Sequence, residues 1–302
     1  MKRVRWVAVA ATVLLLIPLA AGAEPLLLGG VGFGSPANRG ALVEVNQTTG
    51  AGVLVGPGAG PNAGLTGLTV VGARLVYGSA ISNNILVPGA GAPTLLRLDL
   101  DTGMVVESVP ISVGDAPLEV NDLAAMGGVL YATSLSTSTF VSSIYTLDPS
   151  SGAATLVGPT GVIGVAIAFA PGGTLYMTSA TFGAGGQEGS FLHTVNPSTG
   201  AVITTTAIAP LPSGNLLHVG GLAVDPSDGT LYAAGREATV DRRGDIYTLT
   251  PTGLATFVGS TGVGEVGDLA FAEVPEPATI ALLGAAVLAF RVRRRDGRDH
   301  ST

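Results

Sequence analysis

The sequence contains no cysteine, few aromatic residues and few charged ones, and each shortage excludes a class of protein. The absence of Cys excludes a disulfide scaffold, a zinc–cysteine site and thiol catalysis. Aromatic residues make up 5% and charged residues 12% of the 302 positions, and the formal net charge is −7. The chain therefore lacks the basic, aromatic-rich character of a nucleic-acid-binding protein, and we expect no nucleic-acid partner.

Glycine, in contrast, is abundant. The chain has 45 Gly and 19 Pro, but no collagen-like period, and 47% of its residues are hydrophobic. This composition is too apolar for a disordered linker and is typical of a folded domain with many turns. The length allows one large all-β domain or two smaller domains.

Residues 1–23 predict a secretory signal peptide. Lys2, Arg3 and Arg5 form a positively charged start, residues 6–17 form an apolar stretch, and 21–23 are small residues suited to cleavage. We expect signal peptidase to cut after Ala23, so that the chain is exported.

The C-terminal segment, residues 273–302, has three parts in a characteristic order. Its motif is Val274, Pro275, Glu276 and Pro277, and an apolar run follows at 278–290. An arginine cluster ends the segment, formed by Arg291, Arg293, Arg294 and Arg295, with Arg298 beyond it. This arrangement resembles the PEP-CTERM sorting signal. The resemblance implies processing by exosortase, a membrane protease-transpeptidase, and delivery to the cell envelope, the outer surface or the extracellular space.

The apolar run also predicts a short membrane helix. Thirteen residues at 1.5 Å each span roughly 20 Å, less than the ~30 Å hydrocarbon core, and a short span can be accommodated by local thinning of the bilayer. The arginine cluster would act as a membrane stop on the cytoplasmic side, leaving residues 24–273 outside. We therefore expect a transient anchor in the inner membrane. The sequence leaves open whether this helix is removed or retained.

Residues 24–272 repeat one pattern with a period near 50 residues. Five turn glycines, spaced by 53, 49, 48 and 53 residues, mark the repeats: Gly50, Gly103, Gly152, Gly200 and Gly253. Each repeat contains two hairpins of alternating apolar residues, which makes four strands. Repeated tyrosines, among them Tyr131, Tyr145 and Tyr232, are expected to pack between repeats. This period and strand content predict a five-bladed β-propeller, an all-β fold in a single domain.

The domain begins and ends in the middle of a repeat, and its two ends each supply one strand of the same hairpin. Residues 26–30 match the second strand of the second hairpin, and residues 267–271 match its first strand. Together they predict one blade built from both termini, which would close the ring and remove exposed sheet edges.

Superposing the repeats predicts a candidate ligand- or cation-binding site at one mouth of the central channel. Its members precede the innermost strands at equivalent positions: Glu119, Asp122, His218, Glu265 and Asp268. Calcium is the candidate cation because it prefers oxygen ligands, and no other cofactor is expected. The alternative is that these residues are solvated turn residues of an acidic domain.

No catalytic motif is present. The chain has no Gly-x-Ser-x-Gly elbow, phosphate loop or His-Glu-x-x-His motif. We therefore expect a non-catalytic exported surface or matrix protein that binds polysaccharide, protein or cations. The alternative is a secreted propeller hydrolase or lyase that acts on polysaccharide, with the channel-mouth carboxylates as acid and base. The one Trp lies in the predicted signal, which disfavours a tryptophan platform for sugars.

Overall fold

The computed structural model describes residues 24–60, 63–72, 74–82, 92–183, 186–211, 216–237 and 244–273. The predicted signal peptide, the Pro-Glu-Pro motif at 274–277, the apolar run and the arginine cluster at 291–295 lie outside these residues. Within the part that is described, no helix has the length and hydropathy needed to cross a membrane.

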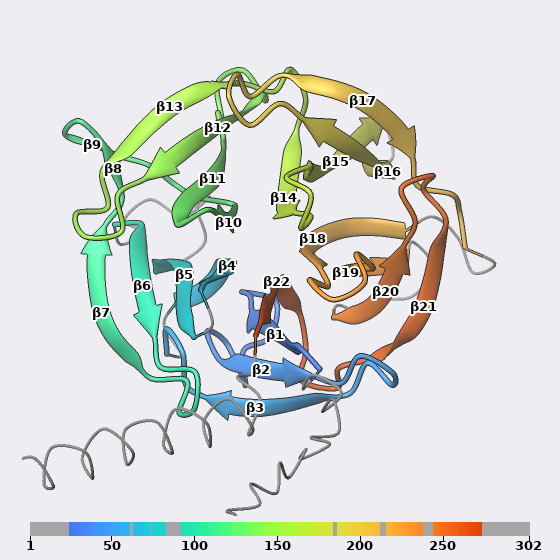
Figure 1. The fold of residues 1–302 in the computed structure, drawn as a ribbon, viewed down its shortest axis with the longest axis horizontal. Helices are drawn as coiled ribbons and strands as arrows, with labels where there is room; N and C mark the ends of the chain where they lie inside the picture. Colours follow the sequence, from blue (N-terminus) through green and yellow to red (C-terminus); the bar gives the residue numbers. More distant parts are fainter. Residues whose placement is uncertain are drawn as a thin grey trace, which may run out of the picture. The chain divides into compact units, whose positions relative to one another are not determined.

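The domain consists of five four-stranded antiparallel sheets arranged as blades around an axis (Figure 1). Blade 1 is β22 (Val266–Ala272), β1 (Leu26–Val31), β2 (Leu42–Val45) and β3 (Gly52–Gly56); blade 2 is β4 (Ala63–Val71), β5 (Leu75–Ser82), β6 (Thr94–Leu98) and β7 (Val105–Pro110). Blade 3 is β10 (Asp122–Met126), β11 (Val129–Leu135), β12 (Ser142–Leu147) and β13 (Ala154–Pro159); blade 4 is β14 (Gly164–Phe169), β15 (Leu175–Gly183), β16 (Gly186–Val195) and β17 (Val202–Ala207). Blade 5 is β18 (Leu216–Val224), β19 (Leu231–Glu237), β20 (Asp245–Leu249) and β21 (Ala255–Ser260), and a small hairpin, β8 (Ser112–Val113) and β9 (Ala116–Pro117), links blades 2 and 3. The predicted five-bladed propeller is confirmed.

The hydrophobic core lies between neighbouring blades. Leu27 and Val43 of blade 1, for example, pack in one cluster with Tyr232 and Ile246 of blade 5. The ring of Tyr232 also meets Phe271 of blade 1 edge-on, with ring centroids 5.6 Å apart. The repeated tyrosine on the second strand therefore packs between blades, as the repeat predicts.

The turn glycines of the repeat are required by the backbone and by the adjacent blade. All five have φ between 62° and 84°, a region that favours glycine. A Cβ at Gly152 would lie 2.0 Å from the carbonyl oxygen of Pro110, and one at Gly253 would lie 2.1 Å from that of Ala207. Each of these turns therefore fits closely against the outer strand of the neighbouring blade.

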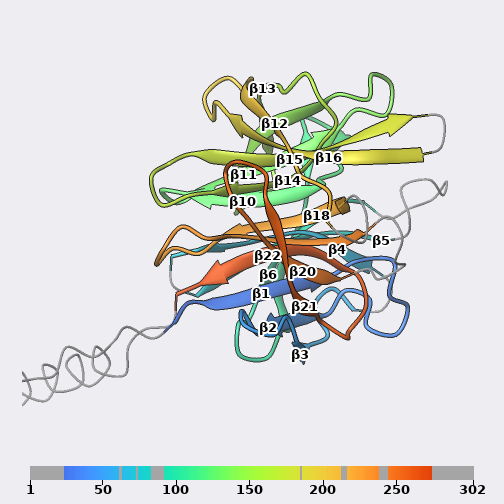
Figure 2. The same ribbon diagram turned by 90° about the vertical axis from the view of Figure 1, so that its right-hand side faces the viewer.

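The ring is closed by strands from the two ends of the domain. β22 pairs with β1 along its length, from Val266 opposite Val31 to Ala272 opposite Leu26. The predicted joint blade is confirmed. The innermost strands begin at one end of the propeller, near Glu119 and Glu265, and we call this end the start face. They finish at the other end, near Glu273, which we call the end face; Figure 2 shows the strands from the side.

Candidate functional site

The innermost strands bring five equivalent positions to one level of the channel, occupied by Gly67, Asp122, Ala166, Gly221 and Asp268. The sequence places these residues just before the strands, whereas in the structure they lie within them, with Asp122 at the first position of β10. Both aspartates are completely buried, with 0% of their surface exposed. They therefore lie inside the channel and not in a solvated turn.

Asp122 connects its own blade to the next one. Its Oδ1 accepts a hydrogen bond from the N–H of Leu123 at 2.5 Å, and its Oδ2 accepts one from the N–H of Ile167 on β14 at 2.6 Å. Both oxygens are therefore engaged by backbone donors of two different blades.

Asp268 repeats this arrangement in the closing blade. Its Oδ1 accepts a hydrogen bond from the N–H of Leu269 at 2.6 Å, and its Oδ2 accepts one from the N–H of Leu68 on β4. Because Leu68 and Ile167 occupy equivalent positions in their blades, the two aspartates make the same pair of bonds.

The two carboxyl groups also lie close enough to affect each other's ionisation, and we call them the Asp pair. Burial raises the pKa of Asp122 to about 8. Burial is the main cause that raises the pKa of Asp268 well above its usual range, and the neighbouring Asp122 carboxyl raises it further. Two buried carboxyl groups this close to each other resist being ionised together, so the pair retains at least one proton at neutral pH.

Two glycines allow the strands to approach closely at this level. A Cβ added at Gly67 would lie 2.9 Å from the Cα of Asp122, and one added at Gly221 would lie 2.8 Å from the Cα of Asp268. The absence of side chains at these positions leaves room for the aspartates at the centre of the ring.

The other three predicted site residues are not members of the Asp pair. Glu119 is half-buried and lines a separate cavity, and burial raises its pKa. Glu265 is half-buried just before β22, and its N–H donates a hydrogen bond to the Oγ of Ser35. His218 belongs to β18, but its side chain lies outside the described part.

The calcium site stays a prediction. Among the residues that the structure describes, no three or more His, Asp or Glu side chains form a group able to hold a metal ion. Asp122 and Asp268 are the two predicted ligands that meet, and both already accept backbone hydrogen bonds.

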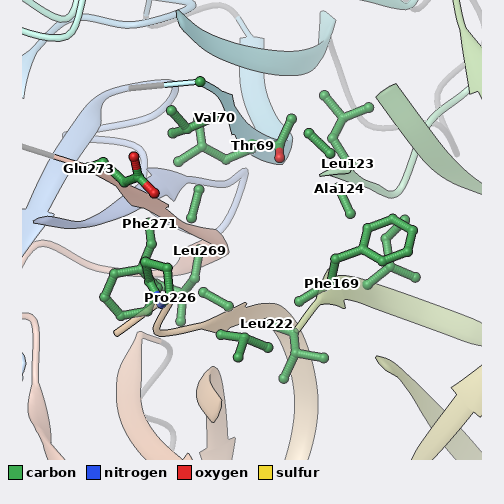
Figure 3. Close-up of a pocket in the computed structure, with 18 residues that line it drawn as sticks. Thr69, Val70, Leu123, Ala124, Phe169, Leu222, Pro226, Leu269, Phe271 and Glu273 are labelled. Carbon is green, nitrogen blue, oxygen red and sulfur yellow. The ribbon is translucent and has the colours of Figure 1, made fainter. Parts of the chain in front are cut away.

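A cavity of about 270 Å³ opens on the end face (Figure 3). The ends of the innermost strands line it with mainly apolar side chains, including Val70, Phe169, Leu222 and Phe271, and Glu273 also lines it. Leu123 and Leu269, which directly follow the two aspartates, contribute to its lining, so the Asp pair lies next to this cavity. We did not expect a cavity here from the sequence. The apolar residues at the ends of the repeated innermost strands are the feature that could have indicated it.

A second cavity, of about 570 Å³, contains Glu119 and is called the Glu119 cavity. It lies between blades 2 and 3 and is lined by Ala92, Pro93, Pro117, Leu118, Glu119, Ser134, Leu135, Ser136, Thr137, Ser143 and Tyr145. The sequence singled out Glu119 but assigned Tyr145 to packing alone. The sequence signal that could have revealed this cavity is the pair of serines, Ser134 and Ser143, at the facing ends of β11 and β12.

Comparison with known families supports the function of the C-terminal segment. The PEP-CTERM protein-sorting motif matches residues 273–295. The chain is thus an exported β-propeller protein with a PEP-CTERM sorting motif. The motif implies processing by exosortase and delivery to the cell envelope or surface.

The propeller itself resembles solved structures only in fold. A chain of a nidogen–laminin complex is 15% identical, with a TM-score of 0.47, and the match covers 83% of this chain and 98% of that one. A gluconolactonase from Xanthomonas campestris is 16% identical, with a TM-score of 0.46 and coverage of 82% and 80%. The glutaminyl cyclase of Myxococcus xanthus is 15% identical, with a TM-score of 0.41 and coverage of 72% and 78%. The sequence matches no curated protein.

Proposed function

We propose that the protein is a non-catalytic propeller of the cell surface or extracellular matrix that binds extracellular polysaccharide. The observation that carries this proposal is the set of hydrogen bonds that the Asp pair accepts from the backbone. Every oxygen of Asp122 and Asp268 accepts a backbone N–H, and both residues are fully buried. Glycoside cleavage needs an acid and a base that face the bond to be broken. The bonding of these two carboxyl groups supports a role in holding blades together.

The export machinery defines the first partners of the chain. Signal peptidase would remove residues 1–23, and exosortase would process the chain at the sorting motif. The apolar run would hold the protein in the inner membrane until this step, with the propeller on the outer side.

A hydrolase or lyase is the second candidate, because one observation favours it. Burial raises the pKa of Glu119, which lines a cavity larger than the one on the end face. A carboxyl group with a raised pKa is what a general acid requires. This candidate would place the chemistry at Glu119 and not at the Asp pair.

The two candidates differ in what they do to a polysaccharide. Mature protein from the producing bacterium would be incubated with that organism's own extracellular polysaccharide, and both binding and the release of reducing ends or unsaturated sugars would be measured. We expect binding without release. Release that is lost in Glu119→Gln would establish the second candidate, and a lack of binding would overturn the proposed polysaccharide function.

A further inference from the structure

The Glu119 cavity has the chemistry of a sugar-binding site. One wall is a face of blade 3, where Ser134 on β11 lies opposite Ser143 on β12. Tyr145 follows Ser143 by two residues and so lies on the same face of the strand. Hydroxyl groups both donate and accept hydrogen bonds, as sugar hydroxyls do. This wall therefore offers paired hydroxyls beside an aromatic ring.

The rest of the cavity lining adds a carboxyl group and apolar rings. Glu119 is half-buried in this lining, which also includes Pro93 and Pro117. A volume of about 570 Å³ lies within the range of small-molecule sites, which is roughly 300–1,000 Å³. An ionised carboxylate accepts hydrogen bonds from neighbouring hydroxyls, while apolar rings pack against the C–H face of a sugar.

The charge of the lining favours an uncharged sugar. No Lys or Arg is present among the described residues that line the cavity. An acidic sugar would bring its carboxylate close to Glu119 without a compensating cation. A neutral ligand avoids this cost.

The loop that joins β11 to β12 provides an independent observation. Phe140 in this loop is 63% exposed and has φ 54°, and it is the sole non-glycine residue with positive φ in the described ranges. A bulky side chain in this conformation is strained, and such strain concentrates at functional positions.

Two backbone hydrogen bonds close this loop. The N–H of Phe140 donates to the carbonyl oxygen of Ser136 at 2.8 Å, and the N–H of Ser136 donates to that of Val141 at 3.1 Å. Ser136 and Thr137, from the same loop, line the cavity. The same loop therefore contributes to the cavity lining and carries a solvent-exposed aromatic ring, which core packing does not explain.

We propose that the Glu119 cavity binds one neutral hexose unit of a polysaccharide, and that the ring of Phe140 stacks on an adjoining unit. This inference rests on the proposed polysaccharide function and gives it a location and a sugar class. Glu119 and the hydroxyls of Ser134 and Ser143 bind the sugar hydroxyls. Tyr145 packs against the ring.

The test uses the mature protein and defined probes. Binding of glucose, mannose and galactose oligosaccharides would be measured by titration calorimetry, with oligogalacturonate as the acidic comparison. We expect a neutral oligosaccharide to bind, and Phe140→Gly and Glu119→Gln each to weaken that binding about tenfold or more. Phe140→Gly is informative because glycine tolerates the positive φ, so the variant should melt at or above the temperature of the parent protein. Phe257→Ala, which removes an exposed aromatic ring from β21, should leave affinity unchanged.

The outcomes separate this inference from the proposed function. Unchanged affinity in both cavity variants, or binding of oligogalacturonate alone, would overturn the cavity assignment. If the protein binds the host polysaccharide and the cavity variants do not alter it, the proposed function stands and the cavity inference fails. If neither the host polysaccharide nor any probe binds, both fail.

Discussion

Asp122 and Asp268 come from innermost strands that are separated by β4, and yet their buried carboxyl groups lie close enough to affect each other's ionisation. Asp268 belongs to the C-terminal strand and bonds to Leu68 on β4, while Asp122 bonds to Ile167 on β14. The Asp pair therefore connects four of the five blades at the centre of the ring. It supplements the pairing of β22 with β1, which closes the ring.

Replacing either aspartate by asparagine should destabilise the domain. The side-chain amide has one oxygen in place of two acceptors, so one backbone N–H in the channel loses its bond. An unsatisfied buried donor costs about 1–3 kcal/mol. Asp268→Asn and Asp122→Asn should each lower the melting temperature by several degrees. Asp115→Asn, the same change at an exposed residue between β8 and β9, serves as the control. Equal melting temperatures for all three variants would contradict the structural role of the pair.

The stability of the domain should depend on pH through the same pair. The folded state holds a proton that the unfolded chain releases above about pH 4. The corresponding stabilisation is complete below that pH and is lost as the pH rises through about 8, the raised pKa of Asp122. The loss amounts to up to about 1.4 kcal/mol per pH unit for each proton.

Urea unfolding at pH 5, 6, 7, 8 and 9 would measure this dependence. Burial lowers the pKa of His193, so the protonation of this side chain reduces the stability of the domain as the pH falls. The Asp122→Asn, Asp268→Asn double variant keeps His193, so the difference between the two proteins isolates the Asp pair. Parallel pH profiles for both proteins would rule out a retained proton.

Deleting residues 264–272 should open the ring. The deletion removes β22 and Asp268 and exposes the edge of β1, which is a template for pairing with other chains. We expect aggregation, measured by light scattering during size-exclusion chromatography. A circular permutant that joins residue 273 to residue 25 and opens the chain between blades keeps every strand, and it should stay monomeric. A soluble monomer with an unchanged melting temperature after the deletion would contradict the closure.

Processing at both ends is expected in the producing bacterium. Intact-mass analysis of the secreted or surface-bound protein should show loss of residues 1–23 and a cut near 275–277. Substituting Glu276→Ala in the matched motif should cause the uncut form to accumulate. Retention of residues 291–298 in the mature protein would be incompatible with a sorting signal that exosortase cleaves.

The fold could be predicted because the repeat itself encodes it. Glycines such as Gly152 recur wherever a turn needs positive φ and the next blade lies close, so their spacing reports the blade period. Superposing repeats also placed Asp122 and Asp268 at one level of the channel. Their close approach could not be predicted, because it depends on the space left by Gly67 and on how far each carboxyl group reaches.

The Glu119 cavity was less accessible to sequence reasoning. Ser134 and Ser143 come together only through the register of β11 and β12, and Pro93 comes from another blade. Phe140 has no sequence signal for its conformation, because its loop contains no glycine to mark a positive φ. Only the backbone dihedral angle distinguishes it from an ordinary exposed residue.

The pairing of Leu26 with Ala272 has a mechanical consequence for a protein held at its C-terminal end. A force transmitted from residue 274 to a ligand on the start face runs along β22, at right angles to its hydrogen bonds with β1. These bonds are then loaded in shear and share the force, whereas peeling would break them one at a time. The closing strand is therefore oriented to resist tension applied at its C-terminal end.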